Sequence, residues 1–142
     1  MDEHLKSQLA QCAIEGAVFS EDPGWFFVFL ENGAMVKELR SLFAGKDAEE
    51  EEAILVFARG AAWESLLDAC GALYRMKETA LTFGKDLVLE KQLTQFLKSP
   101  ASREIRTAFG VPEGMEMVGA VLVKDAVKKE RELRWDVFSS VQ

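Results

Sequence analysis

The sequence is poor in the residue types that most often carry out catalysis. Its 142 residues include one histidine, two cysteines and three prolines, beside 24 acidic residues. His4 lies in a polar N-terminal segment of a kind that is usually mobile, which argues against the common histidine-based acid, base and nucleophile arrangements. Cys12 and Cys70 lie far apart in apolar surroundings without a histidine partner. We therefore expect two free thiols in a reducing compartment, and neither a disulfide framework nor a catalytic thiol.

Long apolar runs and nucleotide-binding motifs are missing as well. No run approaches the roughly 20 apolar residues that a bilayer span needs, and no apolar segment of signal length follows the acidic N-terminus. The chain has neither GxxxxGK[ST] nor GxGxxG. Gly110 and Gly114 enclose the segment GVPEG, but it leads into an expected strand and therefore predicts a turn. We expect no membrane association, no cofactor, no metal site, and an intracellular location in nucleus and cytoplasm.

The excess of acidic residues limits the chain's possible partners. A formal net charge of −7 argues against a surface that binds phosphate as a whole. A local basic group remains, because Lys98, Arg103 and Arg106 bracket a short expected helix. These three side chains either contact an RNA backbone or form an ordinary solvated face. The four consecutive glutamates at 49–52 predict a solvated loop, since one cation needs carboxylates at spaced positions around it.

Continuous apolar segments predict the strands. Residues 25–30 (WFFVFL) follow an Asp-Pro-Gly turn and read as a strand buried on both faces. Residues 53–58 (AILVFA) and 115–124 predict two more strands. The shorter piece at 16–19 is a fourth candidate, paired with 25–30 across the turn.

Helical periodicity appears between these strands. Residues 35–43 form an amphipathic stripe that Asn32 can cap and Gly45 can end. From residue 63 a second helix begins, in which Gly71 suggests close packing against a neighbouring backbone. Four of its apolar residues share one face and are expected in the core, namely Leu66, Leu67, Leu73 and Tyr74.

Two further helices are expected before the last strand. One carries the stripe Leu89, Leu93, Phe96 and Leu97, with Asp86 as its cap. Ser99-Pro100 ends it, and the same pair can start a short helix that ends at Gly110.

Together these elements predict an α+β fold. We expect a small mixed or antiparallel sheet of three to four strands, packed on one face against a layer of about four to five helices. Residues 1–142 are expected to form a single domain, with a charged C-terminal tail over 125–142. A chain of this length can bury, on folding, roughly two thirds of the surface that it exposes when unfolded.

Residues 24–124 resemble the TPRKB-like (PRPK-binding protein) family, the small kinase-binding subunit of the KEOPS/EKC complex. Three packing patterns carry the resemblance: a helix with a short basic link, a helix with a central acidic residue followed by apolar ones, and an isoleucine-containing short helix before a glycine turn. The basic link lies at Leu73–Thr79. The helix with the acidic residue contains Leu89, Glu90 and Leu93, and the short helix with its turn contains Ile105, Ala108 and Gly110.

The resemblance implies a non-catalytic subunit that supports threonylcarbamoyl-adenosine modification of tRNA. Its partners would be a PRPK-type small kinase/ATPase and, indirectly, the threonylcarbamoyl transferase subunit. The kinase-facing residues would be Ile105, Ala108, Phe109 and Val111, although Ile105 and Phe109 are equally compatible with a purely core role. The alternative is a stand-alone adaptor that binds tRNA or single-stranded RNA. An enzyme is disfavoured by the residue inventory.

Overall fold

The computed structural model describes residues 1–15, 24–44, 49–60 and 63–126. Within them the fold is α+β, with five α-helices and four strands. In chain order these are α1 (Glu3–Glu15), β1 (Trp25–Leu30), α2 (Gly33–Ala44), β2 (Glu52–Arg59), α3 (Trp63–Thr82), β3 (Lys85–Leu89), α4 (Lys91–Lys98), α5 (Arg103–Ala108) and β4 (Met115–Asp125). Within these ranges no helix is both long and apolar enough to cross a membrane.

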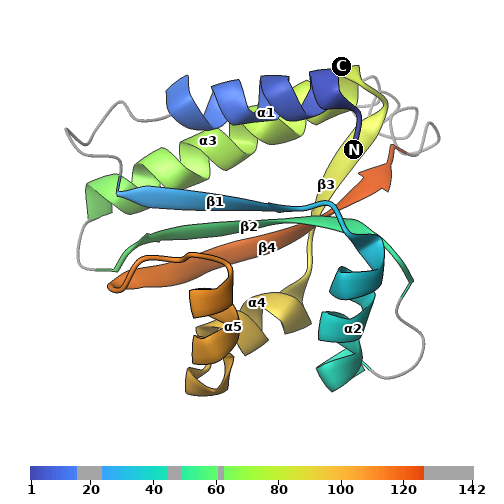
Figure 1. Cartoon of the computed structure of the whole chain (residues 1–142). Coiled ribbons are helices and arrows are strands. Elements are labelled where there is room, and N and C mark those ends of the chain that lie inside the picture. Colours follow the sequence, from blue (N-terminus) through green and yellow to red (C-terminus); the bar gives the residue numbers. More distant parts are fainter. Residues whose placement is uncertain (16–23, 45–48, 61–62, 127–142) are drawn as a thin grey trace, which may run out of the picture.

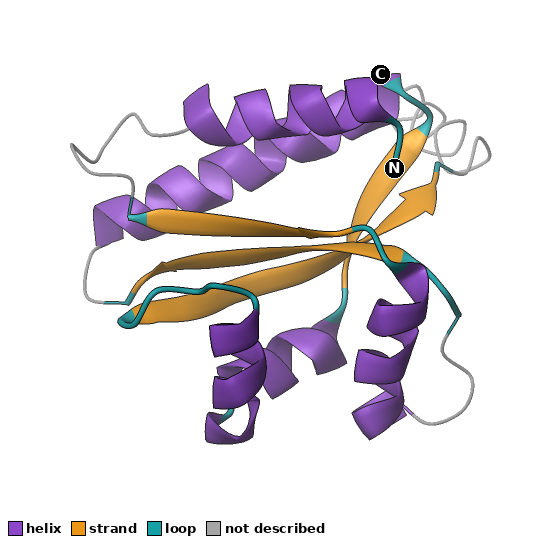
Figure 2. Cartoon of the chain, in the orientation of Figure 1, coloured by secondary structure: helices purple, strands orange, loops and turns teal. Residues whose placement is uncertain are grey.

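The four strands form one antiparallel sheet in the order β1-β2-β4-β3 (Figure 2). Helices cover both faces of this sheet: α1 and α3 lie on one side, and α2, α4 and α5 on the other (Figure 1). The expectation of a helical layer on one face is therefore wrong. The physical reason is β2, whose alternating side chains enter two separate apolar clusters, so both faces of the sheet need cover.

Three of the predicted strands are confirmed as β1, β2 and β4. β2 is buried along most of its length, as its sequence predicts. β1 has apolar contacts on both faces but is only half-buried, because it lies at the edge of the sheet. The candidate strand at 16–19, the helix end at Gly45 and most of the C-terminal tail (127–142) lie outside the described residues.

Helix α1 was not expected from the sequence. Leu5, Leu9 and Ala13 recur every four residues and are buried at 1%, 0% and 4% exposure. The Asp2 carboxylate accepts a hydrogen bond from the backbone N–H of His4 at 2.7 Å. The His4 ring packs edge-on against Phe83 with 5.4 Å between ring centroids. The N-terminal segment is thus part of the packed structure and not the mobile end that we expected.

Strand β3 occupies the place where the sequence suggested the start of a helix. Leu87 points into the core at 3% exposure, whereas Val88 and Leu89 are exposed. The next helix, α4, starts only at Lys91. Its cap is Glu90, whose carboxylate accepts from the backbone N–H of Gln92 at 3.1 Å, so the expected cap Asp86 is wrong.

Three predicted helix boundaries are confirmed. The Asn32 side chain accepts from the backbone N–H of Met35 at 3.2 Å and caps α2. After α4, a 3₁₀ turn (Pro100–Ser102) leads directly into α5. Gly110 follows α5 with a φ of +78°, a left-handed conformation that favours glycine.

Of the four α3 residues expected in the core, Leu73 packs against it and the other three are exposed. The buried face of α3 consists mainly of small residues that lie against α1 and the sheet: Ala69, Ala72, Met76 and Ala80 are all fully buried. Leu66 and Leu67 are 47% and 45% exposed, Tyr74 is 65% exposed, and Leu73 is half-buried. A Cβ at Gly71 would meet no atom of the described residues within 4 Å, so the close packing expected at this glycine is not found among them. Because alanine side chains are small, α3 packs close to α1 and the sheet on this face. The larger side chains of α3 then point to the solvent-exposed face of the helix.

Candidate functional site

Two adjoining cavities surround the short helix α5. We call them the α5 hollow. The smaller has a volume of about 270 Å³ and is lined by Arg103, Arg106, Thr107, Val111, Pro112, Glu113, Gly114 and Met115. The larger, of about 570 Å³, is lined by Leu97, Lys98, Arg106, Glu116 and Met117. Arg106 lines both cavities and therefore marks the centre of the hollow.

A buried serine fixes the position of Arg106. The guanidinium Nε donates to the Ser102 hydroxyl at 3.1 Å, and Ser102 is fully buried. That hydroxyl also lies 2.8 Å from the carbonyl oxygen of Ser99 and 3.1 Å from that of Leu97, so it bridges α4, the 3₁₀ turn and α5. A guanidinium held in this way has lost part of its rotational freedom before any ligand arrives.

The charges of the α5 hollow suit a small anion. Lys98, Arg103 and Arg106 supply cationic donors, and a guanidinium matches the geometry of a phosphate or carboxylate. Glu113 and Glu116 lie at the same hollow and offset part of this positive charge. Such a balance fits a single anionic group better than an extended nucleic-acid backbone.

The structure brings together the three residues that the sequence suggested for RNA contact. Lys98 and Arg106 share the larger cavity, and Arg103 and Arg106 share the smaller one. Their grouping follows from the sharp break at Ser99-Pro100, which sets α5 beside the end of α4. Contact between these residues and RNA stays untested.

The four residues suggested for kinase binding are divided by the structure. Ile105, Phe109 and Val111 pack against the apolar cluster beneath α2, α4 and α5, and Ala108 is exposed. The apolar face of α5 is therefore a wall of the core, which is the alternative that the sequence left open. The kinase-facing role itself stays a prediction, made only from the family resemblance.

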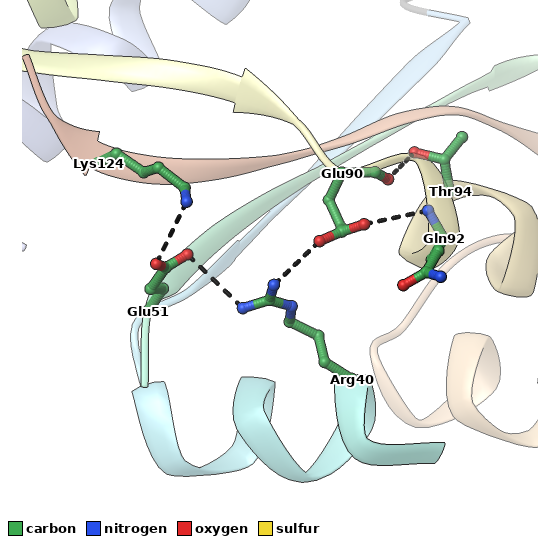
Figure 3. A network of polar contacts seen from close by, with 6 residues as sticks. All are labelled: Arg40, Glu51, Glu90, Gln92, Thr94 and Lys124. Atoms are coloured by element: carbon green, nitrogen blue, oxygen red, sulfur yellow. Dashed lines mark hydrogen bonds and ion pairs between the residues drawn. The ribbon is translucent and has the colours of Figure 1, made fainter. Parts of the chain in front are cut away.

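A second polar cluster lies on the same side of the sheet, between α2, β2, β4 and α4 (Figure 3). Arg40 Nη2 lies 3.1 Å from Glu90 Oε2, and Arg40 Nη1 lies 3.6 Å from Glu51 Oε2. Lys124 Nζ lies 3.5 Å from Glu51 Oε1. The side chains of Arg40, Glu51 and Glu90 are only 13%, 15% and 15% exposed.

This cluster joins segments that are distant in the sequence, and local patterns gave no signal for it. Glu51 belongs to the glutamate run that we expected to be solvated, and for this residue the expectation is wrong. The cluster contains two acids and two bases, so it is electrically balanced. Thr94 extends it: its hydroxyl donates to the Glu90 carbonyl at 2.7 Å and accepts from the Ala120 N–H at 3.0 Å. The arrangement is that of a structural clip between helices and sheet.

The remaining candidate groups lie apart from these two clusters. Among the described residues, no three histidine, cysteine, aspartate or glutamate side chains gather in a way that could hold a metal ion. Cys12 and Cys70 are free thiols, and Cys12 Sγ lies 3.3 Å from Thr79 Oγ1 between α1 and α3. At the far end of the sheet, Lys85 lies 2.5 Å from Asp125 and lowers the pKa of that carboxyl through a hydrogen bond and its charge.

The fold matches that of several nitroreductases of known structure. An FMN-bound nitroreductase from Desulfitobacterium hafniense DCB-2 is 16% identical, with a TM-score of 0.71 over 89% of this chain and 79% of that one. NfrA1 nitroreductase from B. subtilis is 14% identical, with a TM-score of 0.68 over 90% of this chain and 60% of its own. An FMN-dependent nitroreductase from Clostridium difficile R20291 is 12% identical, with a TM-score of 0.64 over 90% of this chain and 78% of that one.

These likenesses define the class of structure: the chain has the nitroreductase fold. No family model matches the sequence. No curated protein matches it either.

The structural matches correct our reading of the sequence. The resemblance to the kinase-binding KEOPS subunit is wrong, and so are the tRNA-modification role, the alternative RNA adaptor and the associated description as a non-catalytic protein. All three of the solved structures above are nitroreductases, which are enzymes, and two of them are described as FMN-bound or FMN-dependent. The earlier resemblance relied on apolar spacing in helices, a pattern that many α+β folds share.

Proposed function

We propose that the protein is an FMN-binding oxidoreductase built on the nitroreductase fold. The observation that carries the proposal is the match with an FMN-bound nitroreductase over 89% of this chain. Fold alone does not define an activity, so the proposal also depends on whether residues of this chain suit the flavin nucleotide. We place the protein inside the cell as part of the same proposal, because its free thiols fit a reducing compartment.

The α5 hollow suits the phosphate end of FMN. Its donor set contains two guanidinium groups and an ammonium, all of which bind phosphate oxygens well. Ser102 holds Arg106 in place before binding. Val111, Pro112 and Met115 add apolar surface beside these donors, as a ligand with both charged and apolar parts requires.

Five residues of the hollow have a definite role in this proposal. When bound, FMN supplies a carrier for two electrons and a proton between a reduced donor and an acceptor. Arg103 and Arg106 bind the phosphate, and Lys98 strengthens the local positive potential. The apolar wall formed by Val111 and Pro112 excludes water beside the ligand. No residue of the described chain is assigned a proton-transfer step.

Replacing Arg106 with glutamine is expected to weaken FMN binding by about tenfold or more, because charge-assisted hydrogen bonds to the phosphate are lost. Equilibrium dialysis and quenching of flavin fluorescence measure this affinity directly. Lys37→Gln is the matched control, since Lys37 is exposed on α2 away from the hollow, and it should leave the affinity unchanged.

The same preparations test the reaction class. Protein loaded with FMN should oxidise a reduced nicotinamide in the presence of a nitroaromatic acceptor. Failure to bind FMN would remove the proposed function. Equal affinities of the wild type and Arg106→Gln would instead leave the function standing and show that the phosphate binds elsewhere.

A further inference from the structure

The smaller cavity of the α5 hollow has opposite charges on its walls that do not pair with each other. Arg103 and Arg106 line it together with Glu113. No ion pair between described residues includes any of these three side chains. Other cationic side chains of the described structure do pair with acidic ones, namely Lys6, Arg40, Lys77, Lys85 and Lys124. The cavity therefore keeps both kinds of charge apart, with space for a ligand between them.

The arginines supply hydrogen-bond donors to this space. Arg106 Nε donates to the buried Ser102 hydroxyl at 3.1 Å, which leaves the N–H groups of both Nη atoms for a ligand. Two parallel N–H groups of a guanidinium match two oxygen atoms of one anion. Arg103 is exposed and lines the same cavity, so it can add further donors. This part of the wall suits the oxygen atoms of a small anion.

Glu113 supplies an acceptor to the same space. The Met115 N–H donates to the Pro112 carbonyl at 3.3 Å and closes a turn that contains Glu113. Gly114 has a φ of +85° in this turn, a left-handed conformation that favours glycine. The turn fixes the backbone at Glu113, and a carboxylate can only accept hydrogen bonds. The ligand that suits the whole cavity is thus an anion that also carries a proton.

We propose that this cavity binds inorganic phosphate in the flavin-free protein, and that Glu113 makes it prefer phosphate to sulfate. Both ions are tetrahedral, and both accept hydrogen bonds from arginine. At neutral pH phosphate keeps a proton on at least one oxygen, whereas sulfate keeps none. The phosphate O–H donates to Glu113, but a sulfate oxygen at the same place meets a carboxylate with no proton between them. The arginines attract the anion, and the glutamate selects it.

The size and charge of the cavity fit a single phosphate ion. Its volume of about 270 Å³ has room for the ion and several water molecules, each of which takes about 30 Å³. Lys98, in the adjoining cavity, adds positive charge nearby. Because Glu113 opposes part of that charge, a polyanion gains less here than one small ion does. The ligand needs no flavin ring, so the inference stands apart from the proposed function, although both place a phosphate group in the α5 hollow.

Isothermal titration calorimetry of the flavin-free full chain tests the site, with phosphate or sulfate added in a chloride buffer of constant ionic strength. We expect phosphate to bind in the millimolar range or more tightly, and sulfate at least about tenfold more weakly. Arg106→Gln should weaken phosphate binding by about tenfold, because charge-assisted hydrogen bonds are lost. Arg103→Gln changes an exposed side chain that does not contact Ser102, so it avoids the risk of unfolding α5, and it should weaken binding severalfold.

Glu113→Gln tests the selection between the two anions. An amide carries no charge to oppose sulfate and can donate a hydrogen bond to it. Sulfate should therefore bind more tightly, and the affinities for the two ions should come within about twofold of each other. Glu104→Gln is the matched control, since Glu104 is exposed on α5 and lines neither cavity, and it should leave the preference for phosphate unchanged.

The outcomes separate the site, its selectivity and the flavin. Absence of phosphate binding by the wild type, or equal binding by the wild type and both arginine variants, would overturn the site. A preference for phosphate that survives in Glu113→Gln would overturn the role of Glu113. A chain that binds phosphate but not FMN would keep this site and lose the proposed function. A chain that binds FMN but not phosphate would do the reverse.

Discussion

Phe57→Ala is expected to lower the free energy of unfolding by about 3–5 kcal/mol, because it removes a fully buried aromatic ring and leaves a cavity. Phe57 lies on central strand β2, paired with Phe26 on one side and Met117 on the other. The pairing of β2 with β4 shifts by one residue next to Phe57, between Val56 and Phe57.

Urea denaturation followed by circular dichroism measures this loss. At one fixed protein concentration the melting temperature should fall by roughly 10 °C. Leu42→Ala is the control, since Leu42 is largely exposed and its replacement should change the free energy of unfolding by less than about 0.5 kcal/mol. Equal losses in the two variants would show that Phe57 is not a core residue.

Glu90→Ala is expected to cost about 2–3 kcal/mol of stability, since this residue performs two tasks. Its carboxylate caps α4 through the Gln92 N–H and also pairs with Arg40, which is only 13% exposed. Removal therefore takes away a helix cap and leaves a largely buried guanidinium with one carboxylate neighbour fewer. The same denaturation experiment gives the loss, and Glu38→Ala, on the exposed face of α2, provides the control.

A double-mutant cycle separates the two tasks. Arg40→Met removes the buried charge, so Glu90→Ala made in that background should cost only about 1 kcal/mol, the usual value of a cap. Additive losses would mean that Arg40 and Glu90 do not stabilise one another, and the assigned ion pair would then be wrong.

The sequence predicted the elements whose own residues carry a strong signal. β1, β2 and β4 are long apolar segments, α2 has a clear stripe with an asparagine cap, and the Ser99-Pro100 break and Gly110 bound the short helix. β3 was missed because four of its five residues are charged or exposed and only Leu87 is deeply buried. α1 was missed because the residues between Leu5 and Leu9 are mostly polar, and the segment resembles a free terminus.

The errors with the largest consequences concern which side of an element is buried. Large apolar residues on α3 were assigned to the core because size and hydropathy favour burial on average. The fold instead uses Ala69, Ala72 and Ala80 as the contact surface, and only tertiary packing determines that choice. The basic residues of the α5 hollow were found because they are close in sequence, whereas Arg40, Glu51 and Glu90 come together only through the fold.

The strand order has a consequence for how the chain folds during synthesis. Central strand β2 pairs with β4, more than fifty positions later in the sequence, so half of its hydrogen-bonding partners emerge last from the ribosome. Until Met115–Asp125 has been made, the apolar segment AILVFA has one unpaired edge and lacks much of its cover. Slow translation or a stalled ribosome before that point would expose this segment to aggregation, which makes the nascent chain a client for a chaperone that binds extended apolar peptides.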